Sequence, residues 1–204
     1  MLIQSLEDKG VKVVSANTDG IVVKHHPSLT PLCDNIVKEW ENTTGFNMEE
    51  TRYDAVYSRD VNNYMAVKGD SLKGKGIFAA SCLMKSPNME ICYNAIKANA
   101  LYRQSVEDYI RNCSDITEFL VVRTVKGGAV KDGEPIGKVI RWYYSTSTDT
   151  AIHYTSNGNK VASSDGGKPL MNLPDTMPGD IDYERYLMET KKIMVDSAYE
   201  EQQW

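Results

Sequence analysis

The stretch KVVSANTDGIVVK, residues 12–24, places a tight-turn sequence between two apolar, β-branched runs. Valine and isoleucine favour strands, whereas Asn, Asp and Gly tolerate the left-handed backbone that tight turns need. The pattern therefore predicts a β-hairpin whose turn is Asn17-Thr18-Asp19-Gly20. Asp19 is then either an ordinary turn residue or a carboxylate that the hairpin tip presents to a metal ion.

The rest of the chain mixes helical and strand patterns. Helices are predicted where apolar residues recur every third or fourth position, and strands where β-branched and aromatic residues cluster between turn residues. Gly10 and Gly45 follow two predicted helices as C-caps, and Asp180 or Asp182 caps the last helix. Predicted helices are residues 1–9, 30–44, 88–113 and one beginning at 180–182; predicted strands are 11–16, 21–26, two within 54–68, 118–125, 137–146 and 151–155; predicted connections are 69–76 and 156–179.

The composition is that of a globular protein: 204 residues, 41% hydrophobic and 25% charged, with a net charge of −5. No apolar run approaches the roughly 20 residues that cross a bilayer, and residues 1–10 lack the regions of a signal peptide. We therefore expect a cytoplasmic protein that makes no membrane contact. An acidic chain can still carry a locally positive surface, so the total charge does not decide nucleic-acid binding. The cysteines form no CxxC pair and are predicted to be reduced core thiols: Cys33, Cys82, Cys92 and Cys113.

Further segments follow the hairpin in a fixed order: YSRDVNNYMAVK (57–68), LKGKGIF (72–78), TEFLVVRTVKGG (117–128), GKVIRWYYS (137–145) and DIDYERYLMETKKIM (180–194). The unit of helix, glycine, strand, turn and strand resembles the palm hairpin of family B DNA polymerases, whose motif C reads Tyr-x-Asp-Thr-Asp-Ser. Thr18 and Asp19 match that motif. YSRDVNNYMAVK (57–68) is similar to the Lys/Tyr strand of the family, and LKGKGIF (72–78) to the Lys-Gly element after it. The three segments that begin at residues 117, 137 and 180 are similar to the thumb and tail of phage-type polymerases.

The resemblance implies an α+β fold in two parts. Residues 1–86 would be the C-terminal part of a palm domain, with the motif C hairpin and an antiparallel sheet packed by helices. Residues 87–204 would be a mixed helical and β thumb with a C-terminal helix. In the family, motif A and the fingers precede motif C, but only sixteen residues precede Asn17 here. The resemblance therefore implies a partner polypeptide that carries the exonuclease domain, motif A and the fingers.

The implied activity is DNA-directed DNA synthesis, in which two Mg²⁺ ions support nucleotidyl transfer from a dNTP to primer-template DNA. Asp19 would be the catalytic metal ligand, with Asn17, Thr18 and Gly20 as its motif neighbours. Asn17 replaces the first Asp of the family motif, so it keeps an oxygen but loses a charge. The candidate DNA-binding residues are Arg59, Asn63, Tyr64, Lys68, Lys73 and Lys75.

Each of these residues also has a structural interpretation. Tyr64 can fill a core, and the lysine-rich run can be a solvated loop. Strand alternation places Trp142 and Tyr144 in a core, with Arg141 and Tyr143 outside. The remaining expectations concern basic residues that either extend a DNA-binding strip or scatter over the surface (Arg111, Arg123, Lys126, Lys131) and an acidic solvated tail (Glu200, Glu201).

Two other functions compete with the polymerase interpretation. The first is a non-catalytic DNA-binding or regulatory module derived from a polymerase, in which Asp19 serves the turn alone. The second is a structural or interaction protein with no nucleic-acid role. Salt-sensitive DNA binding separates the second from the others, because contacts to phosphate weaken steeply as salt rises.

Overall fold

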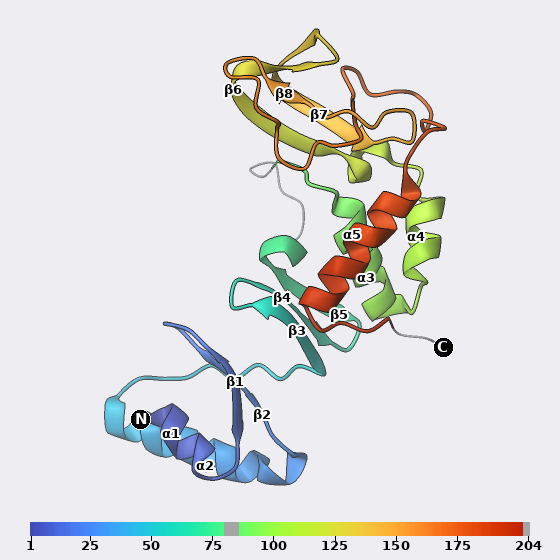
Figure 1. Ribbon diagram of the computed structural model, residues 1–204. Helices are drawn as coiled ribbons and strands as arrows, with labels where there is room; N and C mark the ends of the chain where they lie inside the picture. Colours follow the sequence, from blue (N-terminus) through green and yellow to red (C-terminus); the bar gives the residue numbers. More distant parts are fainter. Residues whose placement is uncertain (80–85, 202–204) are drawn as a thin grey trace.

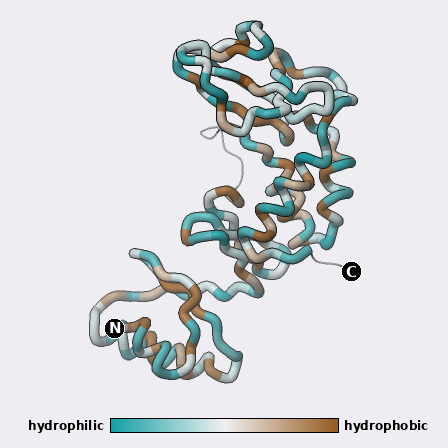
Figure 2. The backbone as a smooth tube through the Cα atoms, viewed as in Figure 1, coloured by the Kyte–Doolittle hydropathy of each residue, from teal (hydrophilic) through white to brown (hydrophobic). Residues whose placement is uncertain are grey.

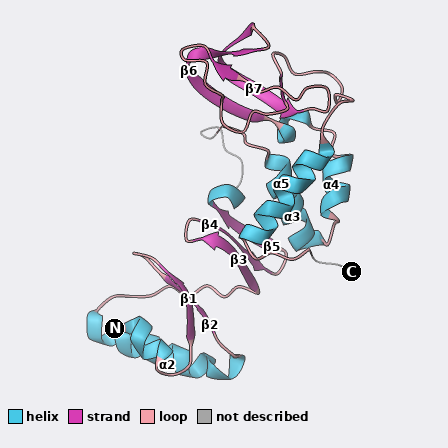
Figure 3. Cartoon of the chain, viewed as in Figure 1, coloured by secondary structure: helices cyan, strands magenta, loops and turns pink. Residues whose placement is uncertain are grey.

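The computed structural model describes residues 1–79 and 86–201 and has an α+β fold, as the sequence predicts (Figure 1). Within these ranges the strands form three separate antiparallel sheets. Figure 3 shows helices beside the hairpin at one end of the molecule and a second group of helices between the other two sheets. Apolar side chains gather in three clusters that follow this division.

The N-terminal unit is the predicted hairpin packed on two helices. Its cluster of Leu2, Leu6, Val11 and Cys33 draws all its members from this unit, and Figure 2 shows the hydrophobic segments of the hairpin beside the helices. The longer helix ends at Gly45, whose φ of 74° is the predicted left-handed C-cap. The elements are α1 (Leu2–Glu7), β1 (Lys12–Ala16), β2 (Ile21–Lys24), the 3₁₀ turn η1 (Pro27–Leu29) and α2 (Thr30–Thr44).

The second sheet contains β3 (Ala55–Asp60), β4 (Asn63–Lys68) and β5 (Ser71–Lys75), in that order, followed by the 3₁₀ turn η2 (Gly76–Phe78). The prediction of a connection over residues 69–76 is wrong, because most of this segment is β5. Gly69 reverses the chain with a φ of 54°, after which Leu72 faces inward and Lys73 outward. The glycines and lysines of this segment conceal an alternating strand pattern.

Gly74 makes a close backbone approach that this sheet requires. A Cβ at this position would lie 1.7 Å from the carbonyl oxygen of Phe78. The absence of a side chain lets η2 fold back on β5, and this places Phe78 beside Met65 in the third cluster. Met65, Phe78, Ile96 and Tyr199 form that cluster, so the sheet packs on a helix and on the C-terminal segment.

The helical layer contains α3 (Glu90–Tyr102), α4 (Val106–Asn112) and α5 (Tyr183–Asp196). The predicted helical segment 88–113 is divided at Arg103, which has a φ of 58°. Asp182 is the N-cap of α5 and accepts a hydrogen bond from the backbone N–H of Arg185 at 3.0 Å, which confirms one of the two predicted caps.

The last sheet has the order β8-β6-β7-β9. Its two central strands extend beyond the predicted limits, because Asp132 and Gly133 form a turn with φ values of 51° and 88°. The elements are the 3₁₀ turn η3 (Ile116–Phe119), β6 (Val121–Lys131), β7 (Glu134–Tyr144), β8 (His153–Tyr154) and β9 (Gly167–Pro169). β9 lies inside residues 156–179, which were predicted as a connection.

Burial in this sheet corrects one prediction. Trp142 and Tyr144 are buried as expected, but Tyr143 on the opposite side of the strand is buried too, with 2% of its surface exposed. Its hydroxyl donates to Asp180 Oδ1 at 2.9 Å. The loop that contains Asp180 therefore covers the outer face of the sheet at this point.

The domain division at residues 86/87 stays a prediction. The cluster around Met65 includes Ile96 and Tyr199 from the predicted thumb. The N-terminal cluster shares no residue with the other two clusters. Cys33 and Cys92 are buried free thiols, Cys113 is half-buried, and Cys82 lies outside the described residues. None of the helices in residues 1–79 and 86–201 has the length and apolar character needed to cross a lipid bilayer.

Candidate nucleic-acid interface

The hairpin tip presents Asp19 to solvent. Asn17 organises the turn: its Oδ1 accepts hydrogen bonds from the backbone N–H groups of Asp19 at 2.9 Å and Gly20 at 2.8 Å. The Asn17 N–H in turn donates to the carbonyl of Gly20 at 2.9 Å. Thr18 and Asp19 are both exposed, and within the described ranges the Asp19 carboxylate has no hydrogen bond or ion pair. Asp19 is therefore free to accept an external ligand, while Asn17 is occupied by the turn.

The tip provides only part of a metal site. Among residues 1–79 and 86–201, no group of three or more His, Cys, Asp or Glu side chains is placed to hold an ion. Mg²⁺ prefers about six oxygen ligands in octahedral geometry, often including several waters. The chain's own residues fit one carboxylate position of such a site and do not complete it.

The second sheet brings four of the predicted DNA-binding residues together. Residues directly opposite each other in an antiparallel pair project from the same face. Tyr64 is opposite Lys75, Ala66 is opposite Lys73, and Lys68 is opposite Ser71. We call the resulting surface the lysine face, and its members are Tyr64, Lys68, Lys73 and Lys75.

The opposite face of the sheet is its core face. Met65 and its register partner Tyr57 belong to the third cluster, as does Leu72 on β5. Since alternate residues point to opposite faces, the lysine face points away from this core. Ala66 in its middle is covered, with 1% of its surface exposed. Lys68, Lys73 and Lys75 are exposed, and none of them has an ion pair with a described residue. Their charges are therefore available to an anionic partner.

Tyr64 lies at one end of the lysine face and is half-buried. It does not belong to the apolar clusters, so the interpretation of Tyr64 as a core-filling residue is not supported by its position. Its register partner on β3 is Ser58, a small exposed residue. The register partners of Tyr64 are therefore the exposed Ser58 on one side and the exposed Lys75 on the other.

Arg59 and Asn63 stand apart from this face. Arg59 lies at the irregularity between Ser58 and Asp60, and its Nε donates to Asp60 Oδ2 at 3.3 Å. Asn63 Nδ2 donates to both oxygens of Asp60, at 2.8 and 2.9 Å, and its Oδ1 accepts from the N–H of Ile77 at 3.0 Å. The hydrogen bond from Asn63, followed by those from the Asn62 N–H and Arg59, lowers the pKa of Asp60. Both residues thus stabilise the β3–β4 turn.

The basic residues of the last sheet and helices do not extend the lysine face as one strip. Lys131 is 7% exposed and its Nζ donates to the carbonyl of Thr150 at 2.5 Å, so its predicted surface role is wrong. Arg111 is paired with Glu107 at 2.7 Å and with Glu184 at 2.5 Å. The guanidinium of Arg123 lies 6.0 Å from the centroid of the Trp142 ring.

A polar group on α3 escaped the sequence analysis. Tyr93, Asn94 and Lys97 line a pocket beside η2. Their i, i+1 and i+4 spacing places Tyr93 and Lys97 one turn apart on α3, beside the buried Ile96, against whose cluster Tyr93 packs. The apolar face of this segment was recognised in the sequence, and the composition of its polar face was the signal left unused.

The models of known protein families and the curated protein sequences give no match to this chain. Its function is therefore argued from the geometry above together with the ordered motifs of the sequence.

Proposed function

We propose that this chain is the C-terminal palm and thumb part of a DNA-directed DNA polymerase, active when a partner polypeptide supplies motif A and the fingers. The observation that carries the DNA-binding part is the common outer face of Tyr64, Lys68, Lys73 and Lys75. Primer-template DNA would lie on this face, held through phosphate and sugar contacts that are independent of base sequence. The assignment to a polymerase rests on the order of the motifs in the sequence.

Asp19 would contribute one carboxylate to the Mg²⁺ ions, and the partner would contribute the others. When bound, the ions would activate the primer hydroxyl and stabilise the triphosphate of the incoming dNTP. The exposure of Asp19 and its lack of a partner among the described residues support this role. The same function would place the protein in the cytoplasm, where the DNA of a host cell or phage is copied.

The hairpin also supports the need for a partner. β1 and β2 form a two-stranded sheet, so each strand has an outer edge that no other described strand covers. Val14 and Val22 on these strands are 50% and 39% exposed. Open edges with apolar side chains favour pairing with another chain, which here would be the polypeptide that carries motif A.

One observation favours a different function, a non-catalytic DNA-binding module. The Asn17 Oδ1 accepts two backbone hydrogen bonds, a role in turn geometry that needs no metal. Under this alternative the lysine face binds DNA and Asp19 has no catalytic part.

Primer extension by the complex of this chain with its partner separates the two functions. We expect Asp19→Ala to reduce extension by at least about a hundredfold, a loss typical of removing a metal-holding or charge-stabilising group. Glu39→Ala, which removes an exposed acid from α2, is the matched control and leaves extension unchanged. Equal extension by wild type and Asp19→Ala would refute catalysis through Asp19, and DNA binding insensitive to salt would refute the lysine face.

A further inference from the structure

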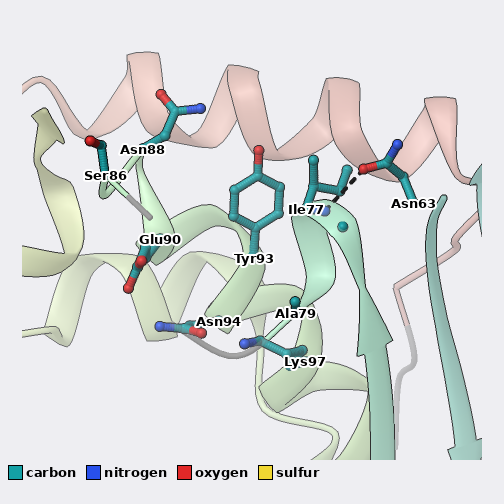
Figure 4. A pocket seen from close by; sticks show the side chains of 10 residues that line it. Asn63, Ile77, Ala79, Ser86, Asn88, Glu90, Tyr93, Asn94 and Lys97 are labelled. Carbon is teal, nitrogen blue, oxygen red and sulfur yellow. Dashed lines mark hydrogen bonds between the residues drawn. The ribbon is translucent and has the colours of Figure 1, made fainter. Parts of the chain in front are cut away.

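A pocket of about 300 Å³ lies between η2 and the first turns of α3 (Figure 4). This volume is at the lower end of the roughly 300–1,000 Å³ of small-ligand pockets. The pocket is large enough for a single planar group and too small for a base pair. Figure 4 shows the Tyr93 ring within the lined space, with Asn88 and Ser86 to one side, Ile77 to the other, and Asn94 and Lys97 along a further wall.

The lining combines an aromatic ring with two amide groups that keep hydrogen-bonding capacity, Asn88 and Asn94. Asn94 Nδ2 donates to Glu118 Oε2 at 3.1 Å, which leaves the Asn94 Oδ1 as an acceptor. The carboxamide of Asn88 has no hydrogen-bonding partner within residues 1–79 and 86–201. A carboxamide offers both donors and an acceptor, the combination that pairs with the edge of a nucleobase. The Tyr93 ring and Ile77 provide the apolar contacts that a planar group needs.

Lys97 adds a cationic donor to this wall. It is half-buried, and within the described part of the chain it forms no ion pair. Burial lowers the pKa of Lys97, while the charges of Glu90 and Glu118 oppose that change. An ammonium group in this position can donate a hydrogen bond to any acceptor, such as a ring nitrogen or carbonyl oxygen, that enters the pocket.

The pocket adjoins the lysine face. Asn63 and Gly76 line it, and their chain neighbours Tyr64 and Lys75 form one end of the lysine face. The pocket therefore lies at the same ends of β4 and β5 as Tyr64 and Lys75, on the side of the sheet that packs on α3. Tyr64 and Lys75 are the members of the lysine face that directly adjoin pocket-lining residues in the chain.

We propose that this pocket receives one unpaired nucleobase at the end of a DNA strand whose duplex part lies on the lysine face. The inference rests on the DNA binding proposed above. Single-stranded bases are held by stacking on aromatic side chains, and their exposed edges by hydrogen bonds. Tyr93 provides the stacking surface, Asn88 and Asn94 the hydrogen bonds to the base edge, and Lys97 a donor to a base acceptor.

The test compares three labelled DNA hairpins by fluorescence anisotropy with the full chain. One hairpin is blunt, one carries a single unpaired adenine nucleotide at its end, and one carries an abasic nucleotide there. The abasic form keeps the sugar and phosphate, so it isolates the contribution of the base. We expect the adenine form to bind about tenfold more tightly than the other two, as stacking and edge contacts to one base provide.

Two variants locate the effect. Lys97→Met keeps the length of the side chain, and Tyr93→Leu keeps apolar volume beside Phe78, whose ring centroid lies 6.1 Å from that of Tyr93. We expect each variant to lose the tenfold preference while binding the blunt hairpin like wild type. Lys192→Met, at an exposed position on α5, is the matched control and keeps the preference. If Tyr93→Leu fails to fold, Lys97→Met and the abasic hairpin still decide.

The outcomes separate this inference from the proposed function. Salt-sensitive binding of all three hairpins with equal affinity would overturn the pocket assignment and leave the lysine face intact. If none of the three hairpins binds in a salt-sensitive way, both the pocket assignment and the lysine face are overturned. The pocket assignment would also be overturned if the abasic hairpin bound as tightly as the adenine hairpin. The same holds if Lys97→Met still bound the adenine hairpin tenfold more tightly than the blunt one. If deoxyadenosine monophosphate binds in a Lys97-dependent way and the hairpins do not differ, the pocket takes free nucleotides and the strand-end assignment is wrong.

Discussion

Lys75 lies directly opposite Tyr64 across the β4–β5 pair, so both side chains project from the solvent face of a sheet whose other face packs on Phe78 and Ile96. This pairing depends on the register of β5, with Ala66 opposite Lys73 two residues along. Four residues separated by up to eleven positions in the sequence become neighbours. The arrangement makes a cationic strip out of a chain with a net charge of −5.

The lysine face predicts a specific salt dependence. Replacing both Lys73 and Lys75 by alanine removes two phosphate contacts, so the slope of log Kobs against log[salt] should become shallower by about 2. The affinity should fall to a similar extent for DNA of any sequence. Anisotropy titrations over a series of salt concentrations measure the slope.

A control with the same change in charge is available on α5. Lys191→Ala/Lys192→Ala removes two exposed lysines that are not members of the lysine face. It should leave the slope unchanged. Equal slopes for the wild type and the Lys73/Lys75 variant would mean that these lysines do not contact phosphate.

The close approach of Gly74 to η2 leaves no room for a side chain at this position of β5. Gly74→Ala places a Cβ 1.7 Å from the Phe78 carbonyl oxygen, and we expect it to lower the free energy of unfolding by about 1–3 kcal/mol, as overpacking does. Urea denaturation measures this change. Gly179→Ala is the control, because a Cβ there meets no atom within 4 Å. An equally small effect at both positions would contradict the argument.

The sequence predicts the elements whose ends carry local signals. The hairpin follows from Asn17 to Gly20, the limits of α2 from Thr30 and Gly45, and the start of α5 from Asp182. In each case the signal is a turn or capping residue whose effect extends over a few positions. β5 was missed because lysine and glycine occupy strand positions that tertiary packing alone selects.

The candidate site is less accessible to sequence analysis. Tyr64 and the lysines are candidates on their sequence pattern, but their common face follows from the pairing of β4 with β5. Lys131 was misread because a loop 19 residues away covers it and provides the Thr150 carbonyl. Glu200 and Glu201 are exposed, as predicted for the tail. Glu201 Oε1 nevertheless accepts a hydrogen bond from the N–H of Val106, 95 residues earlier. Composition carries no information on contacts of such separation.

The C-terminal segment predicts a further stability effect. The buried Tyr199 hydroxyl donates to Asn99 Oδ1 at 2.6 Å, and Tyr199→Phe leaves that acceptor without this bond. We expect the free energy of unfolding to fall by about 1–3 kcal/mol. Tyr102→Phe, at a residue that is 64% exposed, should change it by less than about 0.5 kcal/mol. Urea denaturation at constant m-value tests both, and equal stabilities would exclude a stabilising role for the buried bond.

Asp180 predicts a pH dependence of stability. Burial by itself raises the pKa of this carboxyl group, but hydrogen bonds from Lys168, Ser147, Ser145 and Tyr143 outweigh burial and hold the pKa well below its usual value. A group with a depressed pKa in the folded state stabilises the protein above its unfolded pKa of roughly 4, and that contribution is lost as the pH falls toward the folded pKa.

The corresponding test is Asp180→Asn. At pH 7 we expect it to reduce the free energy of unfolding by about 2 kcal/mol, since it weakens charge-assisted hydrogen bonds. The difference from wild type should shrink progressively below roughly pH 4. Denaturation curves at pH 7 and pH 3 measure it, with the exposed Asp175→Asn as control. A difference that is the same at both pH values would show that the ionised carboxylate is not the stabilising species.

Two substitutions of Asn17 should differ in their effect on the stability of the hairpin turn. Its Oδ1 accepts from the N–H groups of Asp19 and Gly20, so Asn17→Asp retains an acceptor and should keep the turn, whereas Asn17→Ala should destabilise it by about 1 kcal/mol. Amide hydrogen exchange at Asp19 and Gly20, followed by NMR, should accelerate in Asn17→Ala alone. If the tip holds Mg²⁺ with the partner, Asn17→Asp adds a second carboxylate beside Asp19 and should lower the Mg²⁺ concentration at which the complex reaches half-maximal primer extension. An unchanged or higher requirement in a variant with normal exchange would argue that position 17 serves the turn and does not face the metal.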